Sequence, residues 1–582
     1  MHDPSGRWHP GEEAMHRLLR VPYEENPTIR GLPMAYALWM AETPLLALGT
    51  VDRHDRIWTT VLGGAPGVTR PVAPQTLGVH SPALARPGFD PVLEALRTDD
   101  GRPEKLVAGL AIDLEQRTRV KIAGRVRQSA VQATQIAVTV DETLGNCPKY
   151  LNRKAVRPHE ASPQLVSDAL PLPPEAVDLI ARADIFFLSS RHGTESMDTN
   201  NRGGAPGFVR VRSNSDDEGV TLIYPEYSGN RLYQTLGNLR TDPAVGMTFP
   251  DFETGDVLYL TGRAEVLIGA GAAAVLPHSK IAVRVTVEAA RFVTDGLPFR
   301  GRLLDPSPYN PPVRRLARES APLVAAGGKA VARLLHKHPV TPTITRYTFR
   351  LSPDPAHRLE PWRAGQHVTL DFSARLDRGW SHMRDHDPRS LNDDYVRTFT
   401  ISSPPPLGPH TLDGVAFDIT VRRNGPATGL LARWTPLSTL DVTVLGFGGG
   451  ARYADTPAGS AIVVVAAGVG ITPLMAQAPD LLRSGRDLRL LWTLRAADLP
   501  LAADVLERID GLAAVTTLFV TGPAPAVLPG VAAHTRRITK TDVLNAGVQG
   551  RRRFHVCACP QLRDDVLGWV EDEPVRSESF DY

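Results

Sequence analysis

The sequence predicts a multidomain chain: two similar β-barrel units, then an antiparallel β-barrel domain, then a parallel α/β domain. Short sequence motifs that occur twice in the amino-terminal half indicate the repeated units. Short apolar runs broken by turn residues follow them, and in the last part of the chain apolar strands alternate with helical patterns. The 582 residues suffice for several domains of ordinary size.

The first two units are predicted to be copies of one β-barrel. Three words recur in one order, 138 or 140 residues later: GGAPGV (63–68) as GGAPGF (203–208), DLE (113–115) as DFE (251–253), and GR (124–125) as GR (262–263). Matched words at nearly one spacing indicate an internal repeat, and β-rich runs surround them. We expect one barrel in residues 1–160 and another in 175–300, and two such copies could pack as a pseudo-dimer.

Two proline-rich stretches divide the sequence, one beginning at Arg157 and the other at Asp305. Proline at this density disfavours regular elements and suits linkers. We therefore predict a linker at 301–328, a β-barrel domain at 329–453 and an α/β domain at 454–582.

Composition excludes several classes of protein. A formal net charge of +2 without charge blocks argues against a partner such as nucleic acid. The sequence has only 3 cysteines. This small number excludes a disulfide framework, favours a reducing, cytoplasmic location, and cannot supply the four thiolates of a [2Fe-2S] cluster. The first residues lack a signal-peptide pattern, and the most apolar run, from Ala461, is too short and too interrupted to span a membrane.

That apolar run carries the strongest single motif. A predicted buried strand ends in Gly468 and Gly470, and Thr472 and Pro473 follow at once. Glycines let the backbone approach a pyrophosphate closely, Thr472 suits a helix N-cap, and Pro473 suits the first helical turn. Free N–H groups and the helix dipole would then face phosphates. Glycine used only for packing is the alternative, but the Thr-Pro pair and the α/β context favour a dinucleotide site.

A second anion site is predicted upstream. Arg397 and Phe399 share one face of a strand that continues with Thr400. An arginine suits a diphosphate, and a neighbouring aromatic ring can lie against a flavin. Arg422 then precedes the run 425–431 (GPATGLL), which reads as a glycine-containing loop and a helix start. An edge strand with solvated arginines is an equal alternative.

Together these residues resemble the ferredoxin–NADP reductase-like superfamily over roughly the last 250 residues. The matching motif residues are Arg397, Phe399, Thr400, Arg422, Gly425, Thr428, Gly429, Gly468, Gly470, Thr472 and Pro473. The resemblance implies a barrel that binds FAD and a domain that binds NAD(P)H, with Arg495 near the adenosine side. The Ala364–Val368 run is similar to the strand that opens the FAD barrel in this family.

The resemblance also implies catalytic positions. Thr400 would bond near flavin N5, and Cys557 would lie near the nicotinamide, with Cys559 as a rival because the family's Cys-Gly-Pro is Cys-Ala-Cys-Pro here. Glu578 and Phe580 match the Glu-x-aromatic ending over the flavin, and Tyr582 is an alternative aromatic.

The amino-terminal half resembles the pyridoxamine 5'-phosphate oxidase-like split barrels, through the runs 203–211 and 235–239. The run 146–150 (NCPKY) is similar to fusions of this barrel to the reductase module. Members bind FMN, a deazaflavin, haem or no known ligand. Arg210, Arg212 and Asn238 are the candidate phosphate contacts, and solvated surface arginines are an equal alternative.

The resemblances imply a flavin-dependent NAD(P)H:acceptor oxidoreductase, in which electrons pass from FAD to a flavin or other acceptor in the split barrels. The alternatives are a reductase for a separate iron–sulfur partner, with the barrels as a platform, and a ligand-binding sensor module without enzymatic activity. The acceptor, the choice between NADH and NADPH, and the oligomeric state stay open. His382 and His386 have the spacing of helix-borne metal ligands, but their context reads as a solvated loop, so we predict no metal site.

Overall fold

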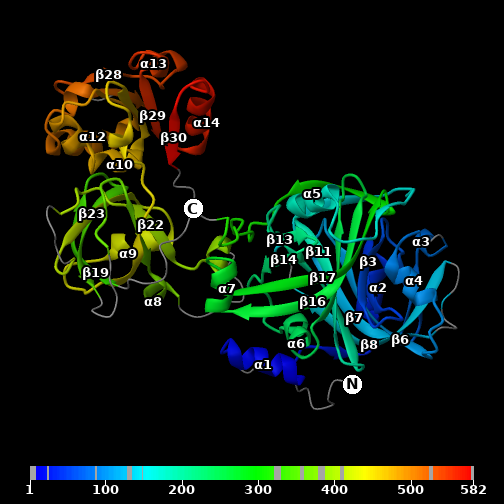
Figure 1. Cartoon of the computed structure of the whole chain (residues 1–582). Coiled ribbons are helices and arrows are strands. Elements are labelled where there is room, and N and C mark those ends of the chain that lie inside the picture. Colours follow the sequence, from blue (N-terminus) through cyan, green and yellow to red (C-terminus); the bar gives the residue numbers. More distant parts are fainter. Residues whose placement is uncertain are drawn as a thin grey trace. The chain divides into compact units, whose positions relative to one another are not determined.

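The computed structural model describes residues 8–22, 25–85, 88–127, 131, 134–146, 149–319, 330–353, 360–377, 387–406, 412–523 and 528–578. The chain forms two compact units. Unit 1 comprises Met1–Ala321 with Trp380–Asp393, and unit 2 comprises Pro322–Gly379 with Asp394–Tyr582 (Figure 1). Within these described ranges, no helix is long and apolar enough to cross a membrane.

Unit 1 contains two antiparallel sheets with the same strand order. The first has the order β3-β2-β6-β7-β8-β5-β4, with β1 paired to β8. Its strands are β1 (Ile29–Arg30), β2 (Leu45–Val51), β3 (Ile57–Gly63), β4 (Thr69–Ala73), β5 (Thr76–His80), β6 (Glu104–Asp113), β7 (Thr118–Arg127) and β8 (Gln135–Asn146).

The second sheet has the order β12-β11-β15-β16-β17-β14-β13, with β10 paired to β17. Its strands are β10 (Gln164–Ser167), β11 (Ile185–His192), β12 (Ser196–Gly203), β13 (Arg210–Ser215), β14 (Gly219–Pro225), β15 (Ala244–Pro250), β16 (Val257–Ile268) and β17 (Ile281–Thr294). Each strand has a counterpart at the same place in the first sheet. This order agrees with the internal repeat predicted from the matched words.

The two sheets of unit 1 pack on each other. Strand β3 contacts β15, and β12 contacts β6 and β7. All seven residues of β2 are buried, because both of its faces are covered, and the strand therefore reads as a continuous apolar run. One hydrophobic cluster joins Val61 and Leu62 of the first sheet to Val257 and Tyr259 of the second.

Short helices complete unit 1. They are α1 (Pro10–Leu18), α2 (Met34–Ala41), α3 (Pro82–Ala85), α4 (Pro91–Arg97), α5 (Pro174–Arg182), α6 (Gln234–Thr241) and α7 (Ala270–Val275). Helix α1 crosses α6 so closely that a Cβ on Gly11 would come within 2.1 Å of the Gly237 carbonyl oxygen.

The predicted linker at 301–328 is wrong for its first residues. Strand β18 (Phe299–Asp305) pairs with β9 (Arg153–Pro158) in a two-stranded sheet of its own. The first proline-rich stretch likewise contains β10, which pairs with β17. Proline density is a local measure, whereas these strands are held by partners far away in the sequence.

Unit 2 begins with a six-stranded antiparallel sheet, in the order β22-β21-β24-β19-β20-β23. Its strands are β19 (Ala330–Pro339), β20 (Ile344–Pro353), β21 (His367–Asp371), β22 (Val396–Thr400), β23 (Ala416–Arg422) and β24 (Asp441–Gly448). A bridge between Ile401 and Ile419 joins the two outer strands, so the sheet closes on itself. The short helix α8 (Ser373–Leu376) and the longer α9 (Gly425–Arg433) lie at its strand ends.

A six-stranded parallel sheet follows, as predicted. Its order is β28-β27-β26-β25-β29-β30, from the strands β25 (Ala461–Ala467), β26 (Leu488–Arg495), β27 (Thr516–Thr521), β28 (Ala532–His534), β29 (Arg552–Cys557) and β30 (Val575–Glu578). The helices are α10 (Thr472–Met475), α11 (Ala478–Arg483), α12 (Leu499–Arg508), α13 (Lys540–Leu544) and α14 (Pro560–Trp569).

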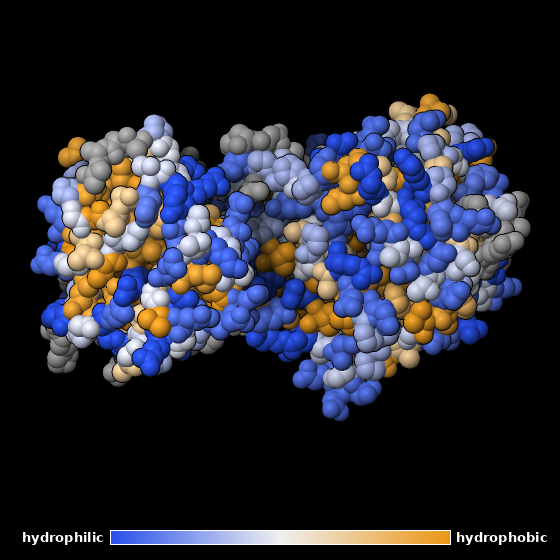
Figure 2. Space-filling view, turned by 90° about the horizontal axis from the view of Figure 1, so that it is seen from above, coloured by the Kyte–Doolittle hydropathy of each residue, from blue (hydrophilic) through white to orange (hydrophobic). Residues whose placement is uncertain are grey.

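Helices cover both faces of this parallel sheet. Figure 1 shows α12 and α14 beside this sheet. Val464 packs with α12 residues such as Leu501, whereas its neighbour Val463 packs with Val566 of α14. Successive residues of a strand point to opposite faces, so β25 must be apolar throughout. On the face shown in Figure 2, hydrophilic residues cover much of the surface and hydrophobic groups lie between them, as on most folded proteins.

Candidate functional site

The strand order of the parallel sheet marks a candidate ligand site. From β25 the chain adds β26, β27 and β28 on one side, and then crosses to add β29 and β30 on the other. The order therefore reverses between β25 and β29. In open α/β sheets, ligands bind outside the carboxyl ends of the strands at such a reversal. Gly468 follows β25 directly, and Cys557 ends β29, so both lie at this point.

The turn after β25 needs both of its glycines. Gly468 has a φ of +53°, a left-handed backbone conformation that residues other than glycine rarely adopt. A Cβ on Gly470 would come within 2.1 Å of the carbonyl oxygen of Cys557, so only glycine fits there. The two glycines thus bring the turn against the end of β29.

The helix after this turn differs from the prediction. Gly468–Ile471 forms a 3₁₀ turn, α10 has only four residues, and Thr472 lies inside the helical conformation with no capping hydrogen bond. The N-cap role predicted for Thr472 is therefore wrong. Because the left-handed Gly468 starts the turn at once, helical geometry begins before Thr472 is reached.

Cys557 and Glu578 lie opposite each other in the ladder of β29 and β30. Glu578 accepts a hydrogen bond from the Ala451 backbone N–H at 3.0 Å, and burial raises the pKa of its carboxyl. Burial, and then the nearby Glu578, raise the pKa of the Cys557 thiol well above its ordinary value. The thiol therefore stays protonated at neutral pH. Phe580 and Tyr582 lie outside the described residues.

The predicted flavin strand is β22. The Arg397 guanidinium donates to the Val396 carbonyl oxygen at 2.9 Å, and the Phe399 ring meets the Phe372 ring edge-on at 6.2 Å between centroids. Thr400 is buried and pairs with His367 across the ladder. All three predicted residues therefore lie on β22, one of the two outer strands that the Ile401–Ile419 bridge joins.

Arg422 has protein partners that the sequence did not reveal. Its guanidinium donates to the Asp498 carboxylate at 2.6 Å and to the Thr343 hydroxyl at 2.7 Å. A Cβ on Gly468 would lie 3.6 Å from an Arg422 nitrogen, so the end of β23 lies beside the glycine turn. Asp498 is buried at the start of α12. Arg422 therefore joins the barrel of unit 2 to its parallel sheet.

Helix α9 starts as predicted, directly after β23. Thr428 is buried, and its hydroxyl bonds both the N–H and the carbonyl oxygen of Asn424. Gly425 has a φ of +75°, and within the described ranges no atom lies within 4 Å of where its Cβ would be. Gly429 follows in the first turns of the same helix. Arg495 is exposed at the carboxyl end of β26, on the same edge as the glycine turn.

Unit 1 contains a cationic pocket. Its lining residues are Arg119, Lys149, Tyr150, Asn200, Asn201, Arg202, Gly203, Pro225, Glu226, Tyr227, Gly229, Asn230, Arg231, Leu232, Tyr233, Gln234 and Thr235. Four of these side chains are cationic, and Glu226, which bonds Arg202 at 2.7 Å, is the acidic one. The pocket therefore favours an anion.

The predicted phosphate contacts of unit 1 do not meet in this pocket. Arg210 lies on the edge strand β13 and pairs with Glu319 at 2.9 Å, and Arg212 is exposed on the same strand. Asn238 is buried in α6 and donates to the Ser190 hydroxyl at 3.1 Å; it lines a neighbouring small pocket. Their phosphate-binding role stays a prediction. Aligning the two repeats at the offset of their matched words would have drawn attention to Asn201 and Arg202 instead.

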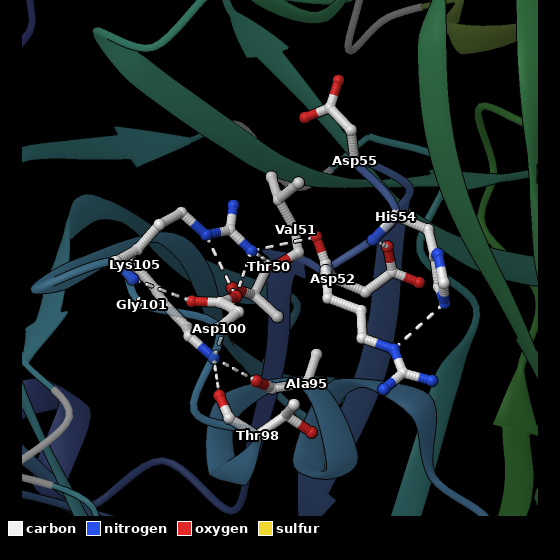
Figure 3. A network of polar contacts seen from close by, with 12 residues as sticks. Thr50, Val51, Asp52, His54, Asp55, Ala95, Thr98, Asp100, Gly101 and Lys105 are labelled. Atoms are coloured by element: carbon white, nitrogen blue, oxygen red, sulfur yellow. Dashed lines mark hydrogen bonds and ion pairs between the residues drawn. The ribbon is translucent and has the colours of Figure 1, made fainter.

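A polar network near Asp52 and Asp100 has a structural role (Figure 3). Asp52 accepts from the backbone N–H of His54 at 2.8 Å, and Lys105 donates to the Ala95 carbonyl oxygen at 2.6 Å. Asp55 points away from the other residues drawn and pairs with Arg191 of the second sheet at 2.6 Å. The polar groups of this network bond to one another, and we assign them no catalytic or binding role.

Cys147, His382 and His386 lie outside the described residues. Among the residues that the structure describes, no cluster of His, Cys, Asp and Glu could hold a metal ion.

Comparison with solved structures gives low similarity. The flavohemoglobin of Malassezia yamatoensis is 16% identical with a TM-score of 0.31, over 44% of this chain and 61% of its own. A ferredoxin NADP+ reductase from Neisseria gonorrhoeae is 15% identical with a TM-score of 0.32, over 44% of this chain and 99% of its own. The CS-b5R domains of human Ncb5or are 12% identical with a TM-score of 0.33, over 64% of this chain and 99% of their own.

No protein-family model and no curated protein matches the sequence. At these TM-scores the solved structures carry no argument about function, which therefore rests on the geometry of the two units.

Proposed function

We propose that this chain is an NAD(P)H:acceptor oxidoreductase that holds FAD in the β19–β24 barrel and the nicotinamide dinucleotide at the β25–β29 crevice. The observation that carries the proposal is the position of the glycine turn. It lies at the reversal of strand order, with Gly470 against Cys557 and Gly468 beside Arg422 of the barrel. A dinucleotide held at this turn would therefore lie next to the barrel.

The residues present fit the two cofactors. For the dinucleotide, the left-handed Gly468 and the closely packed Gly470 keep side chains away from the place where a pyrophosphate would approach. Arg495 adds a cation on the same sheet edge. For FAD, Arg397 and the open start of α9 at Gly425 supply a cation and free backbone N–H groups, and Phe399 supplies a ring.

Bound FAD would accept a hydride from NAD(P)H and release electrons one or two at a time. The chain's own residues bind, orient and hold protons. Thr400 is buried on the flavin strand and offers one hydroxyl, and Cys557 keeps its proton because burial raises the thiol pKa. Glu578 is held toward Ala451 by its hydrogen bond, so its carboxyl is fixed next to the same crevice.

We propose that the acceptor binds in the cationic pocket of unit 1. A pocket with four cationic side chains and three tyrosines suits an aromatic ligand that carries a phosphate, and FMN is the candidate. This favours an internal electron acceptor over a purely structural role for unit 1.

Spectroscopy of the purified chain tests the proposal. The protein should be yellow or become yellow with added FAD, and one of NADH and NADPH should bleach the flavin absorbance anaerobically. The flavins released on denaturation should be FAD together with FMN, and FAD alone would count against FMN in unit 1. A chain that stays colourless with FAD, or a bound flavin that neither nucleotide bleaches, would overturn the proposal.

A further inference from the structure

The segment that precedes the flavin strand β22 belongs to unit 1. Unit 1 includes the chain up to Asp393, and unit 2 resumes at Asp394, two residues before β22 begins. Within this segment, Pro388–Asn392 forms a 3₁₀ turn. Leu391 packs against the hydrophobic cluster around the second sheet of unit 1. The lead into β22 is therefore held by a different unit from the strand itself.

Asn392 is bonded to unit 1 through three hydrogen bonds. Its side-chain nitrogen donates to the Tyr150 hydroxyl at 2.9 Å, and its side-chain oxygen accepts from the Ser228 backbone N–H at 2.9 Å. Its backbone oxygen accepts from the Arg314 guanidinium at 2.9 Å. The three partners lie in separate segments, after β8, after β14 and after β18. A side-chain amide whose donor and acceptor are both used is held in one orientation, so the position of Asn392 is fixed.

Asp394 connects this fixed point to the predicted FAD arginine. Its side-chain oxygen accepts a hydrogen bond from the Val396 N–H at 3.1 Å and lies 3.7 Å from the Arg397 guanidinium. Arg397 is the cation proposed for the FAD diphosphate. Two residues of extended chain span about 7 Å at most, so Asp394 cannot lie far from Asn392. A displacement of Asn392 is therefore passed to the carboxylate beside Arg397.

Tyr395 shows that this short stretch is constrained. Its φ is +59°, in the left-handed region that residues other than glycine rarely adopt. Its side chain is buried in the core of the barrel, and its carbonyl oxygen accepts from the Phe372 N–H at 3.0 Å. A backbone conformation of this kind persists where the surrounding structure holds it. Here the barrel holds Tyr395 itself, and unit 1 holds the chain three residues earlier, at Asn392.

We propose that Asn392 is a positioning residue for FAD: by holding the lead into β22 on unit 1, it fixes Asp394 and thereby orients Arg397 for the diphosphate. The inference rests on the proposed FAD site, and it adds a link between that site and unit 1. Coupling between two sites is reciprocal. FAD bound to the barrel therefore stabilises the bonds of Asn392 to unit 1 by as much as those bonds favour FAD.

Hydrogen exchange at one amide tests this link on the unsubstituted full chain. The Ser228 N–H donates to the Asn392 side chain, so its exchange rate reports that bond directly. After removal of any bound flavin, saturation with FAD should slow exchange at Ser228 at least threefold, measured by mass spectrometry with fragmentation. The Leu172 N–H, which donates to the Asn214 side chain, is the control and should not change. Equal exchange at Ser228 with and without FAD would overturn the proposal.

A pair of asparagine variants adds a matched comparison. Asn214 lies in β13 of unit 1, and its half-buried side chain also uses both its donor and its acceptor, on the Leu172 backbone at 2.9 and 2.7 Å. Asn392→Ala should weaken FAD binding at least threefold, because FAD itself must then order Arg397. Asn214→Ala should bind FAD like the parent. Quenching of flavin fluorescence measures the dissociation constants.

Two further readouts separate positioning from a loss of stability. The visible circular dichroism of the bound flavin should change in Asn392→Ala and not in Asn214→Ala. Asn392→Asp keeps the oxygen that accepts from the Ser228 N–H and should retain more FAD affinity than Asn392→Ala.

Thermal unfolding reports whether each variant folds. If Asn392→Ala unfolds like the parent and binds FAD with the parent's affinity, the proposal is wrong. A chain that binds no FAD at all contradicts the proposed function, whereas FAD binding that does not depend on Asn392 contradicts only the link to unit 1.

Discussion

Gly470 lies directly against Cys557: a Cβ on Gly470 would approach the Cys557 carbonyl oxygen to 2.1 Å. This contact joins the turn after β25 to the end of β29, on the two sides of the reversal in strand order. The glycine is therefore required by packing at the point where the strand order reverses.

Replacing Gly470 with alanine should disturb this turn. The backbone oxygen of Cys557 cannot move far within its sheet, so the turn must shift, at a cost of about 1–3 kcal/mol in stability. We expect the dissociation constant for the nicotinamide dinucleotide to rise at least tenfold, which corresponds to roughly 1.4 kcal/mol. Fluorescence titration with NADH and NADPH measures it.

Gly568→Ala provides the control. Gly568 lies in α14, and within the described ranges no atom is within 4 Å of its Cβ position. Alanine is more favourable than glycine inside a helix by about 1 kcal/mol. This variant should therefore be slightly more stable and should bind the dinucleotide normally. Normal binding by Gly470→Ala would show that the dinucleotide does not use this turn.

The ion pair between Arg422 and Asp498 makes a second prediction. Its atoms are 2.6 Å apart, and the Asp498 side chain is 5% exposed whereas that of Arg422 is 35% exposed. Asp498→Ala leaves Arg422 able to reach water, so we expect a loss of about 2 kcal/mol, less than for a fully buried pair. Urea unfolding measures it.

Asp480→Ala is the matched control for that pair. Asp480 and Arg483 also form an ion pair, at 3.0 Å, but both side chains are more than 70% exposed. Exposed pairs contribute little, so no change in the urea midpoint is expected. Equal effects of the two substitutions would mean that the Arg422–Asp498 contact does not stabilise unit 2.

The sequence predicts well what depends on local pattern. The run from Ala461 is a buried strand because both of its faces meet helices, and such strands are apolar throughout. The repeat is visible in the sequence because matching motifs such as 63–68 and 203–208 occupy the same place in two sheets with the same strand order. The sequence also predicts that the strand carrying Phe399 and the turn at Gly470 face each other across one cleft, and this stays a prediction.

What depends on distant partners could not be predicted. Asp498 lies far from Arg422 in the sequence, and nothing local marks it as that residue's partner. The segment Phe299–Asp305, which leads into the second proline-rich stretch, forms strand β18 only because β9 pairs with it. Arg202 stands out in the sequence only when the strand registers of the two repeats are compared, because Leu62 then occupies the equivalent position. Each of these facts belongs to the pairing of segments and not to either segment alone.

Asp90 should make the stability of unit 1 depend on pH. Burial raises the pKa of its carboxyl from 3.8 to about 6. A raised pKa means that the folded state holds the proton more tightly, so the stabilisation is complete below about pH 4 and is lost as the pH rises through 6. The loss should be up to about 3 kcal/mol, since one pH unit corresponds to about 1.4 kcal/mol.

Asp90→Asn removes this titration and keeps the shape of the side chain. Hydrogen-exchange protection of the α4 amides, measured from pH 4 to 7, should fall in the parent and stay level in the variant. Parallel profiles in the two proteins would rule out a raised pKa at Asp90.

The two described cysteines should differ in reactivity. Cys557 is 2% exposed, and burial and Glu578 raise its pKa, so little thiolate forms near neutral pH. Cys559 is exposed, two residues further along the chain. With iodoacetamide at pH 8, mass spectrometry of the peptide that contains both should show labelling at Cys559 more than tenfold faster than at Cys557. In urea both should react at similar rates, because unfolding removes the burial. If Cys557 in the folded chain reacts as fast as Cys559, its thiol is not held protonated beside the crevice, and the proton-holding role proposed for it is lost.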